Sequence, residues 1–260
     1  LNISEPERVF AVHKGYADAG AEFITANTFG ANSLKYDNVD ELVKAGVALA
    51  KKAGKYVALD IGPTGKLLKP MGDLEFERAV ELFAEVVRAG KDGSDVAIIE
   101  TMSDMYELKA AVIAVKENSD LPIITSMIFD ESGRLLTGGD VKSAVAMLEG
   151  LRVDAIGFNC GLGPKQMIPL VKELRECTSL PILVMPNAGL PESVDGKTVY
   201  NVSPDEFAQD MREIAKLGVS ILGGCCGTTP EYIRQTIAQT AHVPYTLPKQ
   251  KHETVVSSYT

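Results

Sequence analysis

The sequence predicts an α/β fold, a (β/α)8 TIM barrel whose first strand is absent from the given chain. Short apolar, β-branched runs alternate with amphipathic stretches along the 260 residues. The runs recur roughly 30 positions apart, which is the length that a strand, a loop, a helix and a return loop require. The chain begins with a predicted helix at about residues 5–19. Because each helix of a β/α fold follows a strand, we expect that the strand before this helix is absent from the given chain.

The predicted strands are apolar on both faces, as strands of a parallel sheet covered by helices are. They span residues 23–29, 57–61, 96–101, 122–129, 155–160, 181–185 and 220–224. Placing one more strand upstream of Leu1 completes eight β/α units. An open doubly wound sheet is the alternative that this count leaves open.

Helical periodicity fills the intervals between the predicted strands. One apolar stripe consists of Phe76, Val80, Phe83 and Val87, and a second of Leu108, Val112 and Val115. Residues 203–206 (Ser-Pro-Asp-Glu) offer an N-cap, a proline for the first turn and acidic residues near the positive end of the helix dipole. Residues 228–231 offer the same features and have capping-box spacing from Thr228 to Glu231. Both patterns predict that helices begin there. We assign residues 1–244 to the barrel and residues 245–260, where periodicity is lost, to a C-terminal linker or tail.

Composition excludes several classes of function. The formal charge of −9 leaves no basic surface for nucleic acid, so we expect no nucleic-acid partner. No window approaches the roughly 18 apolar residues of a membrane span, so we expect no membrane partner. Four cysteines are too few for a disulfide scaffold, and we therefore expect a cytoplasmic protein. The chain begins with Leu1 and has no signal segment, which indicates a fragment or an incompletely represented chain.

Three of the four cysteines stand at the carboxyl ends of predicted strands, where TIM barrels place their reactive groups. Cys160 ends one strand, and Cys225 and Cys226 follow another. Barrel closure would bring those two strands within roughly 10 Å of each other. Cys177 is the exception, on a predicted helix. Spacing alone leaves a shared metal site and buried packing cysteines as alternatives, because adjacent cysteines lack the usual Cys-x-x-Cys spacing of zinc sites.

The chemistry of a shared site would follow from its sulfur ligands. Three thiolates select zinc and leave its fourth position open. Such a centre has one net negative charge, so it activates water poorly, but an added thiol would bind as a nucleophilic thiolate. This chemistry suits alkylation of sulfur rather than hydrolysis. None of the histidines (His13, His242 and His252) is at a strand end, which disfavours a Ser–His hydrolase. A phosphate cradle at residues 223–229 is a further alternative.

Several motifs together resemble the homocysteine S-methyltransferase family over nearly the whole chain. The most specific are Gly157-Phe158-Asn159-Cys160 and Gly223-Gly224-Cys225-Cys226-Gly227. Further motifs, which begin at Asn27, Asp60 and Pro186, occur along the chain in the same order as in that family. Within the family, the sequence is most similar to the homocysteine-binding modules of cobalamin-dependent methionine synthases, and residues 255–258 resemble the linker to their folate-binding domain.

The resemblance implies a zinc-bearing barrel with Cys160, Cys225 and Cys226 as ligands. It also implies that Asn187 supplies an oxygen ligand until the homocysteine sulfur displaces it, and that Glu100 receives the substrate's amino group. Asn27 and Asp60 are further substrate-binding candidates, although such residues at strand ends often only satisfy loop amides. The family's first strand, with its Asp-Gly-Ala-x-Gly-Thr type sequence, has no counterpart before Leu1.

These implications define the expected function. Homocysteine would bind through its sulfur, and methylcobalamin on another domain would supply the methyl group to give methionine. Folate- and cobalamin-binding domains of a longer parent chain are therefore the expected partners. The alternatives are a free-standing enzyme that uses betaine or S-methylmethionine, a zinc-binding module without turnover, and a phosphate-binding barrel enzyme such as a lyase.

Overall fold

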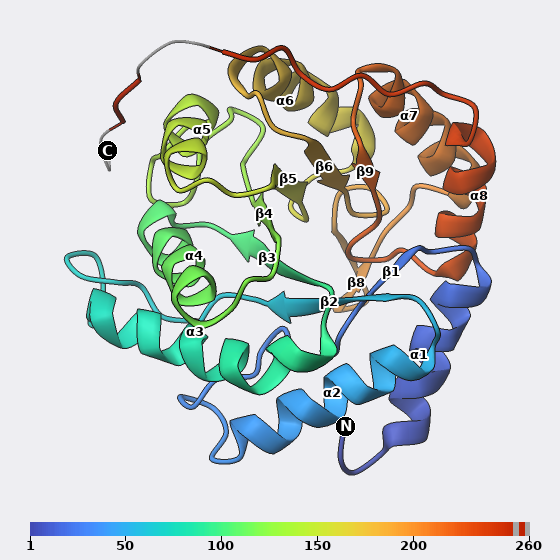
Figure 1. Cartoon of the computed structure of the whole chain (residues 1–260). Coiled ribbons are helices and arrows are strands. Elements are labelled where there is room, and N and C mark those ends of the chain that lie inside the picture. Colours follow the sequence, from blue (N-terminus) through green and yellow to red (C-terminus); the bar gives the residue numbers. More distant parts are fainter. Residues whose placement is uncertain (252–254, 258–260) are drawn as a thin grey trace. The chain divides into compact units, whose positions relative to one another are not determined.

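The structure, a computed structural model, describes residues 1–251 and 255–257. The chain divides into two compact units, unit 1 (Leu1–Thr125) and unit 2 (Ser126–Thr260). In both units parallel strands alternate with helices (Figure 1), which confirms the α/β class. One strand, β4 (Ile123–Met127), begins in unit 1 and ends in unit 2.

Unit 1 contains three parallel strands and the helices that follow them. In chain order its elements are α1 (Pro6–Asp18), β1 (Phe23–Thr25), α2 (Val39–Lys52), β2 (Tyr56–Ile61), α3 (Phe76–Gly90), the short 3-10 helix η1 (Lys91–Gly93), β3 (Val96–Met102) and α4 (Met105–Asn118). Phe23 of β1 lies opposite Tyr56 of β2, and Asp60 of β2 lies opposite Ile98 of β3. This parallel register aligns the carboxyl ends of the strands at one edge of the sheet.

Unit 2 repeats the alternation and adds a hairpin. Its elements are α5 (Val141–Gly150), β5 (Ala155–Asn159), α6 (Pro164–Cys177), β6 (Ile182–Met185), β7 (Glu192–Val194), β8 (Lys197–Val199), α7 (Pro204–Lys216), β9 (Ile221–Leu222) and α8 (Pro230–Thr240). Strand β6 pairs in parallel with β5 on one side and with β9 on the other. Every residue of β5 is buried, as expected for a strand covered on both faces.

Each predicted strand is present, but most end earlier than the apolar runs suggested. The run at 23–29 yields a strand that stops at Thr25, and the run at 220–224 yields only Ile221–Leu222. The reason is that residues beyond the strand leave the ladder to bond elsewhere. The Thr28 hydroxyl, for example, donates to the Asp60 carbonyl oxygen at 2.7 Å. The ends of these shortened strands are therefore loops, and they contain Asn27 and Cys160.

The helix predictions are confirmed in position and corrected in detail. Leu108, Val112 and Val115 of α4 are fully buried, as predicted. In α3, however, the fully buried stripe runs through Ala79, Leu82, Phe83, Val86 and Val87, and Phe76 and Val80 are only half-buried. Phe76 instead packs on the Tyr106 ring of α4, with ring centroids 4.9 Å apart. The prediction was wrong there because α3 also packs against a neighbouring helix rather than against the sheet alone.

The predicted N-cap at Ser203 is confirmed, and the structure shows that it forms a capping box. Ser203 caps α7, where its hydroxyl accepts the Glu206 backbone N–H and the Glu206 side chain bonds back. The box predicted from Thr228 to Glu231 is wrong, because α8 has Thr229 as its N-cap without a side-chain cap bond. The Thr228 hydroxyl donates to the Cys225 carbonyl oxygen at 2.7 Å instead.

The antiparallel hairpin β7–β8 was not predicted. Its turn residues Asp195 and Gly196 both have positive φ, at 50° and 72°. This conformation matches the type I′ turn that Asp-Gly sequences favour between paired strands. The hairpin delivers Tyr200, the residue directly after β8, to the loop that leads into α7.

The tail after α8 contains no helix or strand through Lys251. The Arg175 guanidinium of α6 donates to the backbone carbonyl and hydroxyl oxygens of Thr246, at 2.9 and 2.8 Å. The Lys251 backbone N–H donates to the Ser179 hydroxyl oxygen at 2.9 Å. Contact between the tail and the region around α6 thus continues past the predicted boundary at residue 244, and that boundary stays a prediction. His252 and Ser258 lie outside the described residues.

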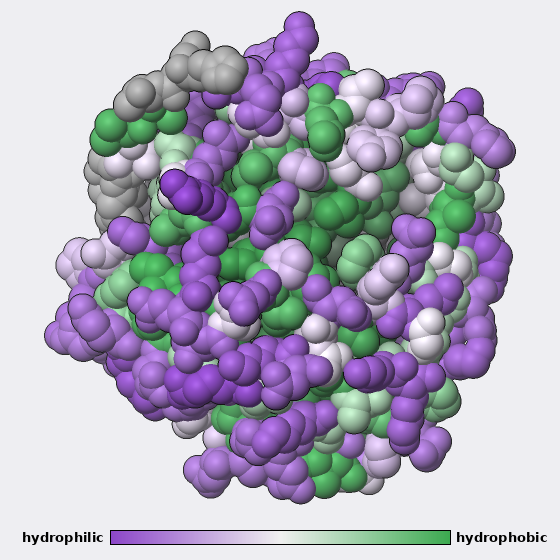
Figure 2. Space-filling model, in the orientation of Figure 1, coloured by the Kyte–Doolittle hydropathy of each residue, from purple (hydrophilic) through white to green (hydrophobic). Residues whose placement is uncertain are grey.

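Charged residues make up 23% of the sequence. Hydrophilic side chains cover the outer surfaces of the helices on the face drawn in Figure 2. Among the described residues, none of the helices combines the length and apolar character needed to cross a membrane.

The contact between β5 and β6 yields a stability prediction. A Cβ atom on Gly157 would lie 1.8 Å from the Leu183 carbonyl oxygen, a backbone atom that cannot move away cheaply. We therefore expect Gly157→Ala to lower the free energy of unfolding by roughly 1–3 kcal/mol or more, as overpacking does. Urea denaturation measures it. Gly150→Ala is the matched control, because a Cβ atom at that position would have no atom within 4 Å; equal stability of both variants would contradict the prediction.

Candidate metal centre

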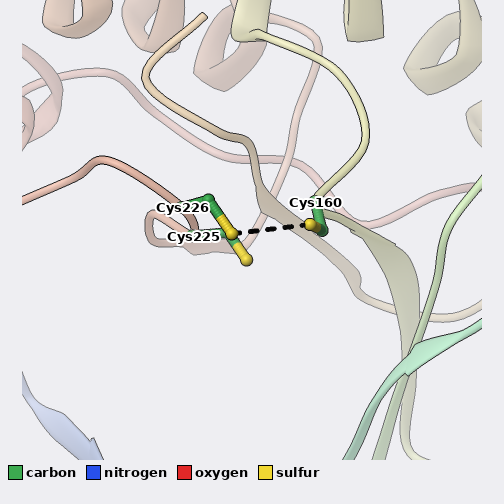
Figure 3. A group of neighbouring side chains, drawn as sticks. All are labelled: Cys160, Cys225 and Cys226. Atoms are coloured by element: carbon green, nitrogen blue, oxygen red, sulfur yellow. Dashed lines mark hydrogen bonds between the residues drawn. The ribbon is translucent and has the colours of Figure 1, made fainter. Parts of the chain in front are cut away.

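The structure brings the three strand-end cysteines of unit 2 together. Cys160 follows β5, and Cys225 and Cys226 follow β9. Their three Sγ atoms all lie within 4.8 Å of one another. Figure 3 shows Cys160 and Cys226 pointing toward each other. Their sulfurs are 3.8 Å apart. None of the three forms a disulfide.

The segment after β6 positions both cysteine-bearing loops. The Cys160 N–H donates to the Met185 carbonyl oxygen at 3.1 Å, and the Cys225 N–H donates to the Pro186 carbonyl oxygen at 2.8 Å. The next residue, Asn187, donates its backbone N–H to the Leu162 carbonyl oxygen at 3.0 Å. These bonds hold the loop after β5 and the loop after β9 against consecutive peptide units of the segment after β6. The sulfurs converge because β6 lies between β5 and β9.

Backbone conformation completes the placement of the sulfurs. Cys160 has a φ of 59°, a left-handed conformation that is uncommon outside glycine and is often found at functional sites. Gly227, directly after the cysteine pair, has a φ of 79°. A Cβ atom on Gly227 would lie 2.6 Å from the Tyr200 ring, so this ring packs directly on the backbone beside Cys226. Only glycine combines this positive φ with the absence of a Cβ atom that would clash with the ring.

Asn187 lies among the sulfurs, as the sequence led us to expect. It is only 2% exposed, and its Oδ1 accepts the Cys226 N–H at 3.0 Å. Its side chain also hydrogen-bonds the Cys160 sulfur. A neighbouring amide, Asn159 at the end of β5, donates from Nδ2 to Cys225 Sγ at 3.8 Å and accepts from the Ser126 hydroxyl at 2.7 Å.

The thiols differ in acidity because they share hydrogen bonds. A hydrogen bond from Cys225 lowers the pKa of Cys160 to about 5, against the opposing effect of burial, and the Gly161 N–H contributes in the same direction. Burial raises the pKa of Cys226, and the charge on Cys160 raises it further. Cys160 therefore ionises first, and its charge resists ionisation of Cys226.

The geometry fits one tetrahedral cation with thiolate ligands. Two sulfurs that each lie about 2.3 Å from a tetrahedral zinc ion are about 3.8 Å apart, which is the separation of the Cys160 and Cys226 sulfurs. A cation would also relieve the repulsion that resists the second ionisation. The fourth cysteine, Cys177, ends α6 and is not part of this cluster, and burial raises its pKa.

The acidic candidates lie in unit 1 and form a coupled pair. Asp60 lies near the end of β2 and is 6% exposed, and Glu100, near the end of β3, is half-buried. Burial raises the pKa of Asp60 well above its usual value, and the charge of Glu100 raises it further. Glu100 precedes Thr101, whose φ is 65°. The structure thus places two carboxyl groups within electrostatic reach at adjacent strand ends.

Asn27 has structural partners. Its Nδ2 donates to Asn2 Oδ1 at 2.7 Å, and Asn2 Nδ2 donates back to the Asn27 carbonyl oxygen at 2.8 Å. Asn2 also donates to the Leu42 carbonyl oxygen at 3.0 Å. This pair connects the start of the chain to the loop after β1, and a substrate contact for Asn27 stays a prediction.

Sequence reasoning missed three residues around these sites. Tyr200 and Asn159 contact the cysteine sulfurs in unit 2. In unit 1, the buried Glu107 of α4 accepts both the backbone N–H and the hydroxyl of Thr64, at 2.8 and 2.6 Å, and so holds the loop after β2. Asn159 was visible next to Cys160 in the motif. Tyr200 and Glu107 had no local signal, because only tertiary packing brings them to these loops.

The fold and the cluster define an α/β-barrel protein with three cysteine thiols gathered at strand ends, an arrangement compatible with a metal centre. The sequence matches the homocysteine S-methyltransferase family over residues 1–240. The chain belongs to this family.

Two curated relatives are methionine synthases. The chain is 32% identical to the protein from Mycobacterium tuberculosis over 99% of its own length, and 32% identical to that from Mycobacterium leprae over 93%. It spans only 23% and 22% of the lengths of those relatives.

Solved structures confirm the barrel fold. The metallated form of the homocysteine methyltransferase MmuM from Escherichia coli superposes with a TM-score of 0.78 at 23% identity. The likeness covers 92% of this chain and 86% of that chain, and the apo form gives a TM-score of 0.73. The fold is thus of the TIM-barrel type, and the described residues contain no strand before α1.

The buried Asp60 carboxyl yields a pH prediction. Because its native pKa lies above its unfolded value near 3.8, the native state binds the proton more tightly. Asp60 therefore lowers the free energy of unfolding as pH rises from about 3.8 toward the native pKa, by up to about 1.4 kcal/mol per pH unit. We expect Asp60→Asn to remove this decline, as measured by urea denaturation at successive pH values.

The exposed Asp120 gives the control for this measurement, since Asp120→Asn changes the same side chain at the surface. Parallel stability curves for wild type and Asp60→Asn across pH 4–8 would show that Asp60 is not the group responsible.

Proposed function

We propose that the chain is the homocysteine-binding module of a methionine-forming methyltransferase, in which Cys160, Cys225 and Cys226 hold one zinc ion. The convergence of three Sγ atoms within 4.8 Å is the observation on which this depends. Family membership over residues 1–240 supports the substrate class. The four cysteines, none of which forms a disulfide, fit a reducing, cytoplasmic compartment.

The cysteine residues would provide an electron-rich ligand set. Zinc, when bound, supplies the Lewis acidity that keeps a substrate thiol in its thiolate form at neutral pH. Cys160, which already ionises at low pH, offers the first thiolate. Cys226 is the exposed member of the set, which leaves the cluster accessible to an incoming sulfur. Homocysteine would then attack the methyl group through this sulfur, and the product thioether would bind weakly.

Asn187 would act as the exchangeable oxygen ligand. Its Oδ1 already faces this cluster, where it accepts the Cys226 N–H with one of its two lone pairs. A neutral amide oxygen is a harder ligand than a thiolate, so homocysteine sulfur would displace it readily. The hydrogen bond to Cys226 would keep the amide in place after displacement.

Glu100 would bind the ammonium group of homocysteine, with Asp60 and Asn27 as weaker substrate-binding candidates. Burial and the charge of Glu100 both raise the pKa of Asp60, which supports Glu100 as the member of the pair that contacts the ammonium group. A single negative charge suffices to bind one ammonium group.

Methylcobalamin on another domain is the proposed methyl donor. The two methionine synthases are more than four times as long as this chain, since the chain covers only 23% and 22% of them. The other parts of a parent chain would then bind folate and cobalamin, and residues 245–260 would form the connection. We keep one alternative, a free-standing enzyme that uses betaine or S-methylmethionine, because MmuM matches this chain over 86% of its own length.

Zinc stoichiometry tests the proposal. We expect one zinc ion per wild-type chain, and substantially less than one in Cys160→Ser and Cys226→Ser, because each loses a thiolate ligand. Cys177→Ser is the matched control and should retain full occupancy. Metal analysis after dialysis measures occupancy, and X-ray absorption with and without homocysteine counts sulfur ligands. Equal zinc content in all four proteins would refute the assignment; zinc without a new sulfur ligand on adding homocysteine would indicate a binding module without turnover.

The methyl donor is tested separately. We expect methionine to form from homocysteine and free methylcobalamin, and not from betaine or S-methylmethionine, in the zinc-loaded protein. Chromatographic detection of methionine measures each reaction. Turnover with S-methylmethionine or betaine alone would favour the free-standing enzyme.

A substrate analogue tests Glu100. We expect Glu100→Gln to lower kcat/KM for homocysteine by roughly tenfold to a hundredfold, because a charge-assisted hydrogen bond to the ammonium group is lost. The analogue 4-mercaptobutyrate lacks that ammonium group, so the same substitution should leave its kcat/KM nearly unchanged. Equal losses for both thiols would show that Glu100 acts on folding or metal binding instead.

A further inference from the structure

Each sulfur of the cysteine cluster has a hydrogen-bond donor from the protein. Cys160 receives the Gly161 N–H and the Asn187 side chain, and Cys225 receives Asn159 Nδ2. Cys226 is bonded by the Tyr200 hydroxyl. Cys226 differs from the other two in being exposed, so it is the member that electrophiles reach most easily.

Tyr200 is held at Cys226 by its surroundings. Its ring packs on the Gly227 backbone, and the loop beyond it is fixed on both sides. The Val202 N–H donates to the Ala188 carbonyl oxygen at 3.1 Å, and the Tyr232 hydroxyl donates to the Val202 carbonyl oxygen at 2.8 Å. The Ala188 N–H in turn donates to the Cys226 carbonyl oxygen at 2.9 Å. The phenol and the sulfur it contacts therefore belong to one continuous hydrogen-bonded structure.

We infer that Tyr200 is a specificity-determining residue that protects the Cys226 sulfur from methylation, so that the methyl group is transferred to the substrate sulfur. The hydroxyl donates its proton to a sulfur lone pair of Cys226. This inference rests on the proposed function, because it concerns the choice among sulfurs that share one cation.

The physical reason lies in how a sulfur is alkylated. A sulfur lone pair forms the new S–C bond while the bond from carbon to the leaving group breaks, and its electron pair departs with the leaving group. A lone pair that accepts a hydrogen bond is lower in energy and attacks more slowly. Methylation of Cys226 would convert a thiolate ligand into a weakly binding thioether, and the centre would be lost. The exposed protein thiolate is thus the one for which protection matters most.

Site-resolved alkylation of the zinc-loaded protein tests this inference. Iodoacetamide alkylates sulfur with loss of iodide, and tandem mass spectrometry separates Cys225 from Cys226. We expect Tyr200→Phe to accelerate alkylation of Cys226 roughly tenfold, the factor that corresponds to one lost hydrogen bond to a charged group. The rates at Cys160 and Cys225 should change much less.

Tyr232→Phe is the matched control, because it removes a hydroxyl from the same hydrogen-bonded structure without removing a bond to sulfur. It should leave the Cys226 rate near that of wild type. The cobalt(II)-loaded proteins give a second measurement, since loss of a hydrogen bond to a thiolate ligand shifts the sulfur-to-metal charge-transfer band to longer wavelength. We expect this shift in Tyr200→Phe and not in Tyr232→Phe.

Three outcomes would overturn the inference. The first is an unchanged Cys226 rate and an unchanged cobalt spectrum in Tyr200→Phe. The second is equal acceleration in both variants, which would assign the effect to a loosened loop. The third is loss of zinc from Tyr200→Phe in excess zinc, which would make Tyr200 a residue needed to hold the metal. Failure of the proposed function is distinguishable, because wild type itself would then lack zinc.

Discussion

The backbone hydrogen bonds of the segment after β6 are the constraint on which the cysteine cluster depends. Met185 and Pro186 present consecutive carbonyl oxygens to the N–H groups of Cys160 and Cys225. These two loops therefore move with β6 rather than independently. The parallel pairing of β6 with β5 and β9 fixes its register, so the positions of the sulfurs follow from sheet geometry. Loops alone would lose this precision, because a flexible loop must give up conformational entropy to hold one geometry.

Charge at the cluster follows from the same placement. Bringing three thiols within 4.8 Å lets them bond to one another, and Cys160 gains a pKa of about 5 as a result. That first negative charge opposes the ionisation of Cys226. A divalent cation would remove this opposition, so metal binding and ionisation of the thiols would be coupled. In unit 1, the coupled pair Asp60 and Glu100 limits its charge in a similar way, since burial favours the protonated form of Asp60.

The sequence predicted the features that depend on local pattern. Alternating apolar runs and amphipathic stretches gave the fold class. Cysteines at strand ends allowed a shared site, because barrel topology brings those ends together, and the family resemblance favoured it over separate packing cysteines. Features set by tertiary packing were missed. Glu107 and Tyr200 reach loops that are distant in sequence. In α3, Phe83 and Val87 are buried as predicted, but Phe76 packs on the Tyr106 ring of α4 and is only half-buried. The β7–β8 hairpin did have a local signal, the Asp195-Gly196 turn, which was overlooked.

In the proposed function, protein and substrate sulfurs would share one cation, so the methyl donor could react with either kind of sulfur. The module would then present three thiolates of its own to the donor. Burial protects Cys160 and Cys225 in part, whereas Cys226 is exposed. Its protection must therefore come from bonding rather than from exclusion, and the Tyr200 hydroxyl is the donor in place there. The glycine after Cys226 has a direct purpose in this scheme, because a side chain at Gly227 would displace the Tyr200 ring from the sulfur.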